Sequence, residues 1–499
     1  MKLLQSLAQK ARAVAPFRAG MLVRGGVLAG SKAAAFFATV LIARNLSPAE
    51  AGGFFFSLSL GAVLGLLFAL GLGETASREV PRLDATGGSH LARPLLAGSV
   101  RLVTMAAAVG SALAAVMLWL VIPGKVAFIV AGVVVGVGLA FQSLGAGFLR
   151  ARHRYGLAEA WQALAPTLFL IALVPSVLLF DVGGGSLLGV RVGLEVLAGS
   201  LALGCVLFVF RGRAQEASGR RVRRDMAKTL LLSAPLWVTT LCWLAVQQSG
   251  VVALGLYRDP SAVGIYAPIL KVAEACTLTL AAITPYLLPE ASRLDARGDY
   301  ARIQTLYDSA TKWVFVAAVP LIAPLVLVPR ETVHLMLGIR APEVATVSRL
   351  LAASFLLFAL FGASEALLQA NCRARKLARR SSLILTATVV INIVLVRRFG
   401  IAGAAIGNLV AYSLFAAINA RLLHTELLIG AFSATSGRVV GVALVSTVMM
   451  GLMLGFIDED LTSVAVATVG VAVPTLVTAL MPTRRSNLSG TLRSELQSA

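Results

Sequence analysis

The chain has 499 residues, of which 58% are apolar and 13% charged, and its mean hydropathy is +0.86. Average soluble proteins carry about 25% charged residues, so this composition excludes a soluble protein and favours one built from bilayer-spanning helices. The net charge of +21 is distributed over short loops rather than over a folded basic domain, so it does not indicate nucleic-acid binding.

Fourteen stretches are long and apolar enough to span a bilayer, for which a helix needs about 20 residues. We therefore predict an all-α integral membrane protein with about 14 transmembrane helices. We expect residues 1–20, which carry four Lys and Arg residues, to be an amphipathic lead-in to the first helix rather than a secretory signal. The predicted spans are 21–44, 52–72, 96–122, 127–149, 160–180, 185–210, 229–254, 262–288, 312–329, 346–370, 381–396, 401–423, 438–457 and 462–481.

The basic residues in the loops predict the orientation. With a cytoplasmic N-terminus, the cytoplasmic loops hold 31 Lys and Arg residues and the opposite loops hold 7. Because cytoplasmic loops of membrane proteins are enriched in Lys and Arg, both termini are predicted to be cytoplasmic.

An internal repeat divides the chain. EVPRLDATGG (79–88) matches EASRLDARGD (290–299) at six of ten positions, and NLSPAEAGGF (45–54) corresponds to YRDPSAVGIY (257–266). Both R-L-D phrases are predicted to be cytoplasmic loops. Parallel repeats of this kind occur in transporters, with the solute site between the halves. We predict lobes over 1–228 (helices 1–6) and 229–423 (helices 7–12), followed by helices 13–14 and a tail over 424–499.

Charged residues inside the spans are the first candidates for a binding site, since each costs about 2.5–3.5 kcal/mol at a helix centre on insertion scales. Lys32 lies near the middle of its span, and Lys271 about nine residues into its own. Either lysine is a cavity cation or part of a structural ion pair with Glu274 or Glu195. The further candidates are the cations Arg101 and Arg191 and the acid Glu365.

Several of these further candidates have structural alternatives. Arg191 and Glu195 are four residues apart, so they can form a local pair on one helix face. Arg101 can extend to the headgroups, and Glu365 lies near the predicted cytoplasmic end of its helix. Uncharged polar residues in the spans are candidate sugar contacts or interhelical hydrogen-bonding groups: Gln142, Gln247, Gln248, Asn392 and Asn408.

Motifs for chemistry or cofactors are missing from the sequence. The four cysteines and four histidines have no metal-ligand spacing, and there is no nucleophile triad, phosphate-binding loop or nucleotide fingerprint. We predict neither a cofactor nor a metal, and we predict that the protein is not an enzyme.

Three longer stretches carry a family resemblance. They are ARNLSPAEAGGFFFSLSL (43–60), GIYAPILKVAE followed by LPEASRLDARGD (264–274 and 288–299), and RRFGIAGAAIGN (397–408). They resemble the polysaccharide-exporter, Wzx-like oligosaccharide flippase branch of the MATE/lipid-flippase (MOP) superfamily. Lys271 falls at the basic position that follows G-x-Y in the family pattern.

The resemblance implies a function in the bacterial inner membrane. A Wzx-like flippase moves an undecaprenyl-diphosphate-linked oligosaccharide to the outer leaflet for exopolysaccharide, O-antigen (lipopolysaccharide) or capsule synthesis. The implied partners are this lipid-linked substrate, membrane lipids, a polysaccharide polymerase and glycosyltransferases. Lys32 and Lys271 are then expected to bind the diphosphate, with Arg101 and Arg191 as further cations.

Other functions stay open at this point. Lipid II flippases share the same plan, and MATE-type drug or cation antiporters and a membrane scaffold for polymer synthesis are further alternatives. An antiporter needs buried carboxylates, but all nine Asp residues fall in predicted loops. The scaffold does not explain charge inside the spans.

Overall fold

The computed structural model is helical throughout its regular segments. It describes residues 26–27, 30–85, 92–121, 125–152, 154–180, 183–210, 219–295, 297–371, 374–430, 434–454 and 460–480. A first helix covers residues 30–45. It is followed by α2 (Pro48–Ala69), α3 (Leu72–Ala85), α4 (Ala92–Val121), α5 (Val126–Ala151), α6 (Tyr155–Leu179), α7 (Gly184–Val209), α8 (Gly219–Tyr257), α9 (Pro260–Glu274), η3 (Ala275–Thr277), α10 (Leu278–Asp295), α11 (Tyr300–Leu327), α12 (Pro329–Leu337), α13 (Val344–Asn371), α14 (Ala374–Leu427), α15 (Ala434–Leu454) and α16 (Asp460–Leu480).

The predicted fold class is confirmed. Within the described residues, twelve helical segments are long and apolar enough to cross a membrane. One of them, α14, joins two arms at Gly400, whose φ of 57° lies outside the helical region. Counting both arms gives thirteen spans among the described residues, and the first helix, described over residues 30–45, is too short in that part to be counted with them. The chain is thus a multi-pass membrane protein.

The second helix of each half is interrupted. Leu70 and Gly71, with φ of 51° and 65°, separate α2 from α3, and the short 3₁₀ turn η3 separates α9 from α10. The predicted single span 262–288 is therefore wrong in this detail. A 3₁₀ turn within a helix often marks a functional hinge.

The repeated R-L-D phrases are helical, so their prediction as loops is also wrong. The first lies in α3, and the second closes α10, where Arg293 pairs with Glu290 one turn earlier at 2.5 Å. These polar helices extend beyond the apolar spans, which is why hydropathy reads them as loops. Likewise, α8 begins at Gly219, so the predicted lobe boundary at residue 228 falls inside a helix.

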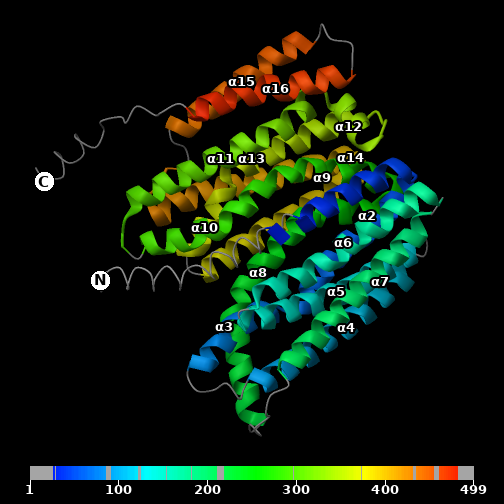
Figure 1. Ribbon diagram of the computed structural model, residues 1–499, viewed down its shortest axis with the longest axis vertical. Helices are drawn as coiled ribbons and strands as arrows, with labels where there is room; N and C mark the ends of the chain where they lie inside the picture. Colours follow the sequence, from blue (N-terminus) through cyan, green and yellow to red (C-terminus); the bar gives the residue numbers. More distant parts are fainter. Residues whose placement is uncertain are drawn as a thin grey trace, which may run out of the picture.

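Two hydrophobic cores fill the described part of the bundle. One lies wholly within residues 68–210, where α2, α5 and α7 end. The other joins the beginnings of α2 and α7, including Phe54 and Leu187, to α9 and later helices. The N-terminal helices therefore share a core with the later ones only at the end where α2 and α9 begin. Figure 1 shows α3 and α10 well separated at the other end, with α15 and α16 along the outer edge.

Two basic side chains connect the halves at the shared end. Arg44, at the end of the first helix, donates to the carbonyl oxygens of Leu335 and Met336 at the end of α12. Lys125, just before α5, donates to the carbonyl oxygens of Gly255 and Arg258 at 2.8 and 2.6 Å. Burial lowers the pKa of Lys125, and the nearby Asp259 carboxylate opposes that shift.

Candidate functional site

A cavity of about 260 Å³ lies between the first helix, α2, α6 and α7 on one side and α8, α9 and η3 on the other. It begins within one or two turns of the shared end and reaches the break after α9. Because α9 is interrupted there, the cavity lies beside a discontinuous helix, which is where many transporters bind their solutes.

Three of the predicted cations line this one cavity. Lys32 comes from the first helix, Arg191 from α7 and Lys271 from α9. Among the described lining residues, Glu274 is the acid, and Gln248 contributes an amide from α8 whose Oε1 is buried with no hydrogen-bond partner in that part of the chain. Three cations against one acid make the wall positive, so it is suited to an anion.

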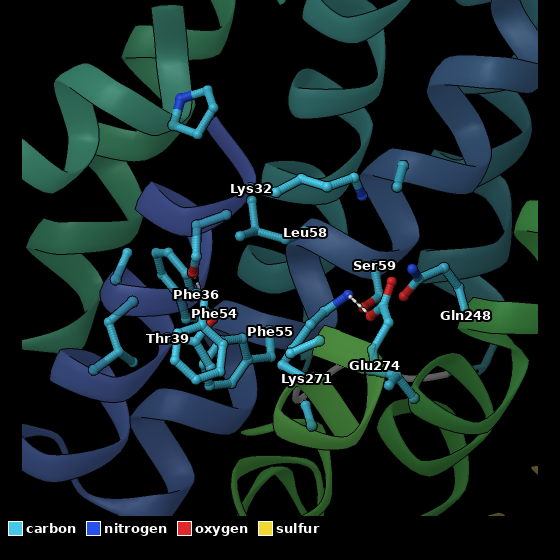
Figure 2. Close-up of a pocket in the computed structure, with 18 of the residues that line it drawn as sticks. Lys32, Phe36, Thr39, Phe54, Phe55, Leu58, Ser59, Gln248, Lys271 and Glu274 are labelled. Atoms are coloured by element: carbon cyan, nitrogen blue, oxygen red, sulfur yellow. Dashed lines mark hydrogen bonds and ion pairs between the residues drawn. The ribbon is translucent and has the colours of Figure 1, made fainter. Parts of the chain in front are cut away.

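Lys271 and Glu274 form an ion pair within the cavity. The Nζ atom of Lys271 donates to Oε2 of Glu274 at 2.6 Å, three residues along α9. Their side chains remain 35% and 20% exposed, so both are reachable from the cavity. Figure 2 shows the two side chains meeting there, beside Ser59 and Gln248. The structural pairing that the sequence left open for Lys271 is thus present, and the pair also faces the cavity.

Arg191 is held differently. Its Nη2 donates to Oε1 of Glu195, whose other oxygen accepts from Nε2 of Gln142 at 2.6 Å. Glu195 is only 2% exposed and stands behind Arg191. Within the described part of the chain, the Nε and Nη1 atoms of Arg191 are buried and have no hydrogen-bond partner. Glu195 and Gln142 therefore orient the guanidinium of Arg191 at the cavity wall.

Part of the cavity wall is aromatic and apolar, and the sequence did not predict these aromatic residues. Phe54 of α2 and Phe169 of α6 stack with centroids 5.5 Å apart, and both line the cavity. The guanidinium of Arg191 lies 5.5 Å from the Phe169 ring centroid, a cation–π contact. The Phe triplet at 54–56 is a visible signal, but aromatic residues are common throughout apolar helices.

The remaining predicted site residues do not line the cavity. Arg101 is exposed on α4. Asn392 donates to Ser249 at 2.8 Å, while Gln247 and Asn408 hydrogen-bond to the hydroxyls of Tyr412 and Tyr266. These three make interhelical contacts, the alternative that the sequence left open for them.

Glu365 belongs to a separate polar cluster. It accepts from Arg380 at 2.7 Å, and Arg380 also donates to Asn419 at 2.7 Å. Asn419 in turn donates to Ser364 at 2.8 Å. Arg380 was missed as a buried group because it falls in a predicted loop.

The acids and histidines do not cluster for metal binding. Among the described residues, no group of three or more His, Cys, Asp or Glu side chains could hold a metal ion. The cations and the amide that line the cavity offer electrostatic binding and hydrogen bonding of an anion, with an apolar aromatic surface beside them.

A comparison with protein families identifies the family of this chain. The model of the polysaccharide biosynthesis protein family matches residues 18–294, more than half of the chain. The chain belongs to this family. The match includes the first helix, α2, α6, α7 and α9, and hence Lys32, Arg191 and Lys271. A search of curated proteins finds no match.

Solved structures show the same fold at low identity. The lipid II flippase MurJ in an inward closed conformation is 10% identical, with a TM-score of 0.71, covering 95% of this chain and 100% of that one. A multidrug resistance MATE family transporter of the MOP superfamily, inward-facing, is 15% identical with a TM-score of 0.62, covering 82% and 98%. The MOP-type fold predicted from the sequence is thereby confirmed.

Proposed function

We propose that this member of the polysaccharide biosynthesis protein family is a flippase. It moves a polyprenyl-diphosphate-linked oligosaccharide across the bacterial inner membrane for exopolysaccharide, O-antigen or capsule synthesis. One observation carries the proposal: Lys32, Arg191 and Lys271, from three separate helices, meet at one cavity within the membrane-spanning region.

The charge of the cavity suits a diphosphate. A diphosphate esterified at both ends carries one ionised oxygen on each phosphorus, hence two negative charges. In a site of low dielectric these charges need cations and hydrogen-bond donors. Two lysines supply point charges, and the guanidinium of Arg191 supplies a planar fork that fits phosphate oxygens.

The aromatic wall suits the sugar. Pyranose rings carry apolar C–H faces as well as hydroxyls, and Phe54 and Phe169 present apolar rings next to the cations. Gln248, whose Oε1 is buried without a partner, offers an acceptor to a hydroxyl. The polyprenyl tail has no need of the cavity, because it is soluble in the bilayer.

Alternating access supplies the movement without bond chemistry, so the protein acts as a transporter and not as an enzyme. Residues 1–228 and 229–423 form two lobes that rock about the cavity, and α15 and α16 are appended. Lys32 and Arg191 come from the first lobe and Lys271 from the second. Both termini are cytoplasmic, which places the shared end of α2 and α9 on the outer side.

The two rival transport functions make different demands. A cationic drug needs a free carboxylate, but Glu274, the acid that lines this cavity, is already paired with Lys271. A lipid II flippase remains a second candidate, because a diphosphate would need the same cations and the MurJ structure shares this fold.

Deletion of the gene is the direct test. Our proposal expects an oligosaccharide on polyprenyl diphosphate to accumulate in the cytoplasmic leaflet, as seen by mass spectrometry of extracted lipids. Accumulation of a peptide-bearing disaccharide lipid would favour the lipid II flippase. Sensitivity to cationic drugs without any lipid accumulation would favour the antiporter and refute the flippase.

Complementation of the deletion strain with charge variants tests the site. Lys32→Ala or Lys271→Ala should remove most transport at unchanged protein level, and Lys→Arg should restore part of it because the charge is kept. Lys271→Glu should abolish transport by repulsion. Normal transport by Lys271→Ala at a reduced protein level would instead assign Lys271 a purely structural pair with Glu274.

A further inference from the structure

Two ion pairs lie at the cavity, and they differ in how firmly the acid is held. Glu195 is 2% exposed, does not line the cavity, and accepts from both Arg191 and Gln142. Glu274 lines the cavity with a side chain that is 20% exposed, and its carboxylate accepts from Lys271. Glu195 is thus fixed behind its cation, whereas Glu274 stands in front of Lys271 where a ligand arrives.

The position of Glu274 in the fold allows it to move. It is the last residue of α9 and directly precedes the 3₁₀ turn of Ala275–Thr277. Ala275 and Thr277 line the cavity together with Glu274. A carboxylate beside a 3₁₀ turn and an open cavity can leave Lys271 without disturbing a packed core.

The charges of the lining residues show what the pair does to the site. Lys32, Arg191 and Lys271 are positive, and Glu274 is negative. Lys32 also attracts the carboxylate of Glu274 electrostatically. When the cavity is empty, Glu274 therefore compensates lysines that would otherwise lie uncompensated within the membrane, which is costly.

We propose that Glu274 is an internal counter-anion, which occupies Lys271 in the empty cavity and is displaced by the incoming diphosphate. Because both anions need the same ammonium group, Glu274 lowers the affinity for substrate. In the empty transporter, Glu274 balances the charge of Lys271 while the two lobes reorient. Glu274 is a positioning residue that acts through Lys271, and this inference rests on the proposed flippase function.

The first test measures binding of farnesyl diphosphate to the purified protein in nanodiscs by titration calorimetry. Glu274→Gln should bind this probe about two- to fivefold more tightly, the range that a partly exposed ion pair supports. Glu290→Gln is the matched control. It removes an acid paired three residues along a helix with Arg293, away from the cavity, and should leave the affinity unchanged.

The second test separates competition from a structural role. Glu274→Asp keeps the anion, so its affinity should return close to that of the wild type. In reconstituted vesicles, Glu274→Gln should flip substrate more slowly in repeated cycles, because the empty site returns with an uncompensated lysine. Both tests use only variants that elute as a single folded species in size-exclusion chromatography.

The outcomes test the role of Glu274 and the proposed diphosphate site separately. Equal or weaker binding of farnesyl diphosphate by Glu274→Gln, with binding by the wild type intact, overturns the counter-anion and leaves the flippase standing. An aspartate variant that behaves like the glutamine variant also overturns it, since length and not charge would then matter. No binding by the wild type refutes the diphosphate site and the counter-anion together.

Discussion

Gly52 of α2 lies directly against the backbone carbonyl of Pro260 at the start of α9, so that a Cβ atom on Gly52 would come within 1.7 Å of the Pro260 oxygen. The reciprocal contact has the same form: a Cβ on Gly264 would come within 1.9 Å of the Pro48 oxygen. These are the residues that the internal repeat aligns, Pro48 with Pro260 and Gly52 with Gly264. The two copies therefore cross backbone to backbone about a local twofold axis.

This crossing of Pro48, Gly52, Pro260 and Gly264 predicts a conformational effect. A methyl group at Gly52 or Gly264 cannot be accommodated unless α2 and α9 separate. Overpacking of this kind costs about 1–3 kcal/mol, which shifts a two-state equilibrium by about 5–150-fold. We expect Gly52→Ala and Gly264→Ala each to reduce transport strongly by depopulating the state with this end closed.

The crossing is tested by solvent accessibility together with transport. A cysteine placed on α9 at Ala267, which is buried and lines the cavity, should react faster with a water-soluble maleimide in the Gly52→Ala background. Gly189→Ala is the control, because a Cβ there meets nothing within 4 Å, and it should behave like the wild type. Unchanged reactivity and transport in Gly52→Ala would show that the helices need not meet at this point.

The topology gives a second prediction. In a variant without native cysteines, Gly185→Cys and Glu343→Cys should be labelled by an impermeant maleimide in intact cells, once the outer membrane has been permeabilised. Gly185 is exposed in the first turn of α7, and Glu343 is exposed just before α13 begins. Arg302→Cys, whose parent side chain is 70% exposed near the start of α11, should be labelled only after lysis. The reverse pattern would invert the orientation that the basic loops predict.

The sequence predicted the helices well because a bilayer leaves little choice. Each span must be apolar over about 20 residues, and that signal identified every candidate span among the described residues, including the two arms that meet at Gly400. It placed the ends poorly at α3 and α8, where charged helix continues beyond the apolar stretch. Hydropathy measures solubility in lipid and does not distinguish a polar helix from a loop.

The candidate site was predictable in part for the same reason. Charge inside a span is costly and therefore informative, and it identified Lys32, Arg191, Lys271 and Glu274, which do meet at one cavity. It does not say which way a side chain faces, so Arg101 was selected although it lies away from the cavity. Phe169 was missed because an aromatic residue in an apolar helix carries no comparable signal.

Arg191 and Arg101 therefore give a third prediction that separates a cavity cation from an intramembrane cation elsewhere. Arg191→Lys keeps the charge but loses the planar fork whose Nε and Nη1 are buried without partners. Loss of one charge-assisted hydrogen bond should weaken binding of farnesyl diphosphate about tenfold or more. Arg101→Lys should change it by less than about twofold, as surface substitutions do. Equal effects of both substitutions would remove Arg191 from the site.

The last prediction concerns stability in the second half of the chain. Arg380 is 6% exposed and is bound by Glu365 and Asn419. Removing one partner of a buried ion pair leaves an uncompensated charge and costs about 3–5 kcal/mol. Because Glu365 is 20% exposed, we expect Arg380→Ala to lie at the lower end of that range. The measurement is the fraction of folded protein left after heating in detergent.

Two further variants show whether charge burial is the cause. In the double variant Arg380→Met with Glu365→Gln both charges are gone, so it should be more stable than Arg380→Ala and close to the wild type. Lys376→Ala, on the same arm of α14 as Arg380, removes a pair with Glu426 of the other arm, but those side chains are 55% and 31% exposed. That loss should cost at most about 1 kcal/mol. If the double variant were no more stable than Arg380→Ala, the lost hydrogen bond to Asn419, and not the stranded carboxylate, would explain the destabilisation.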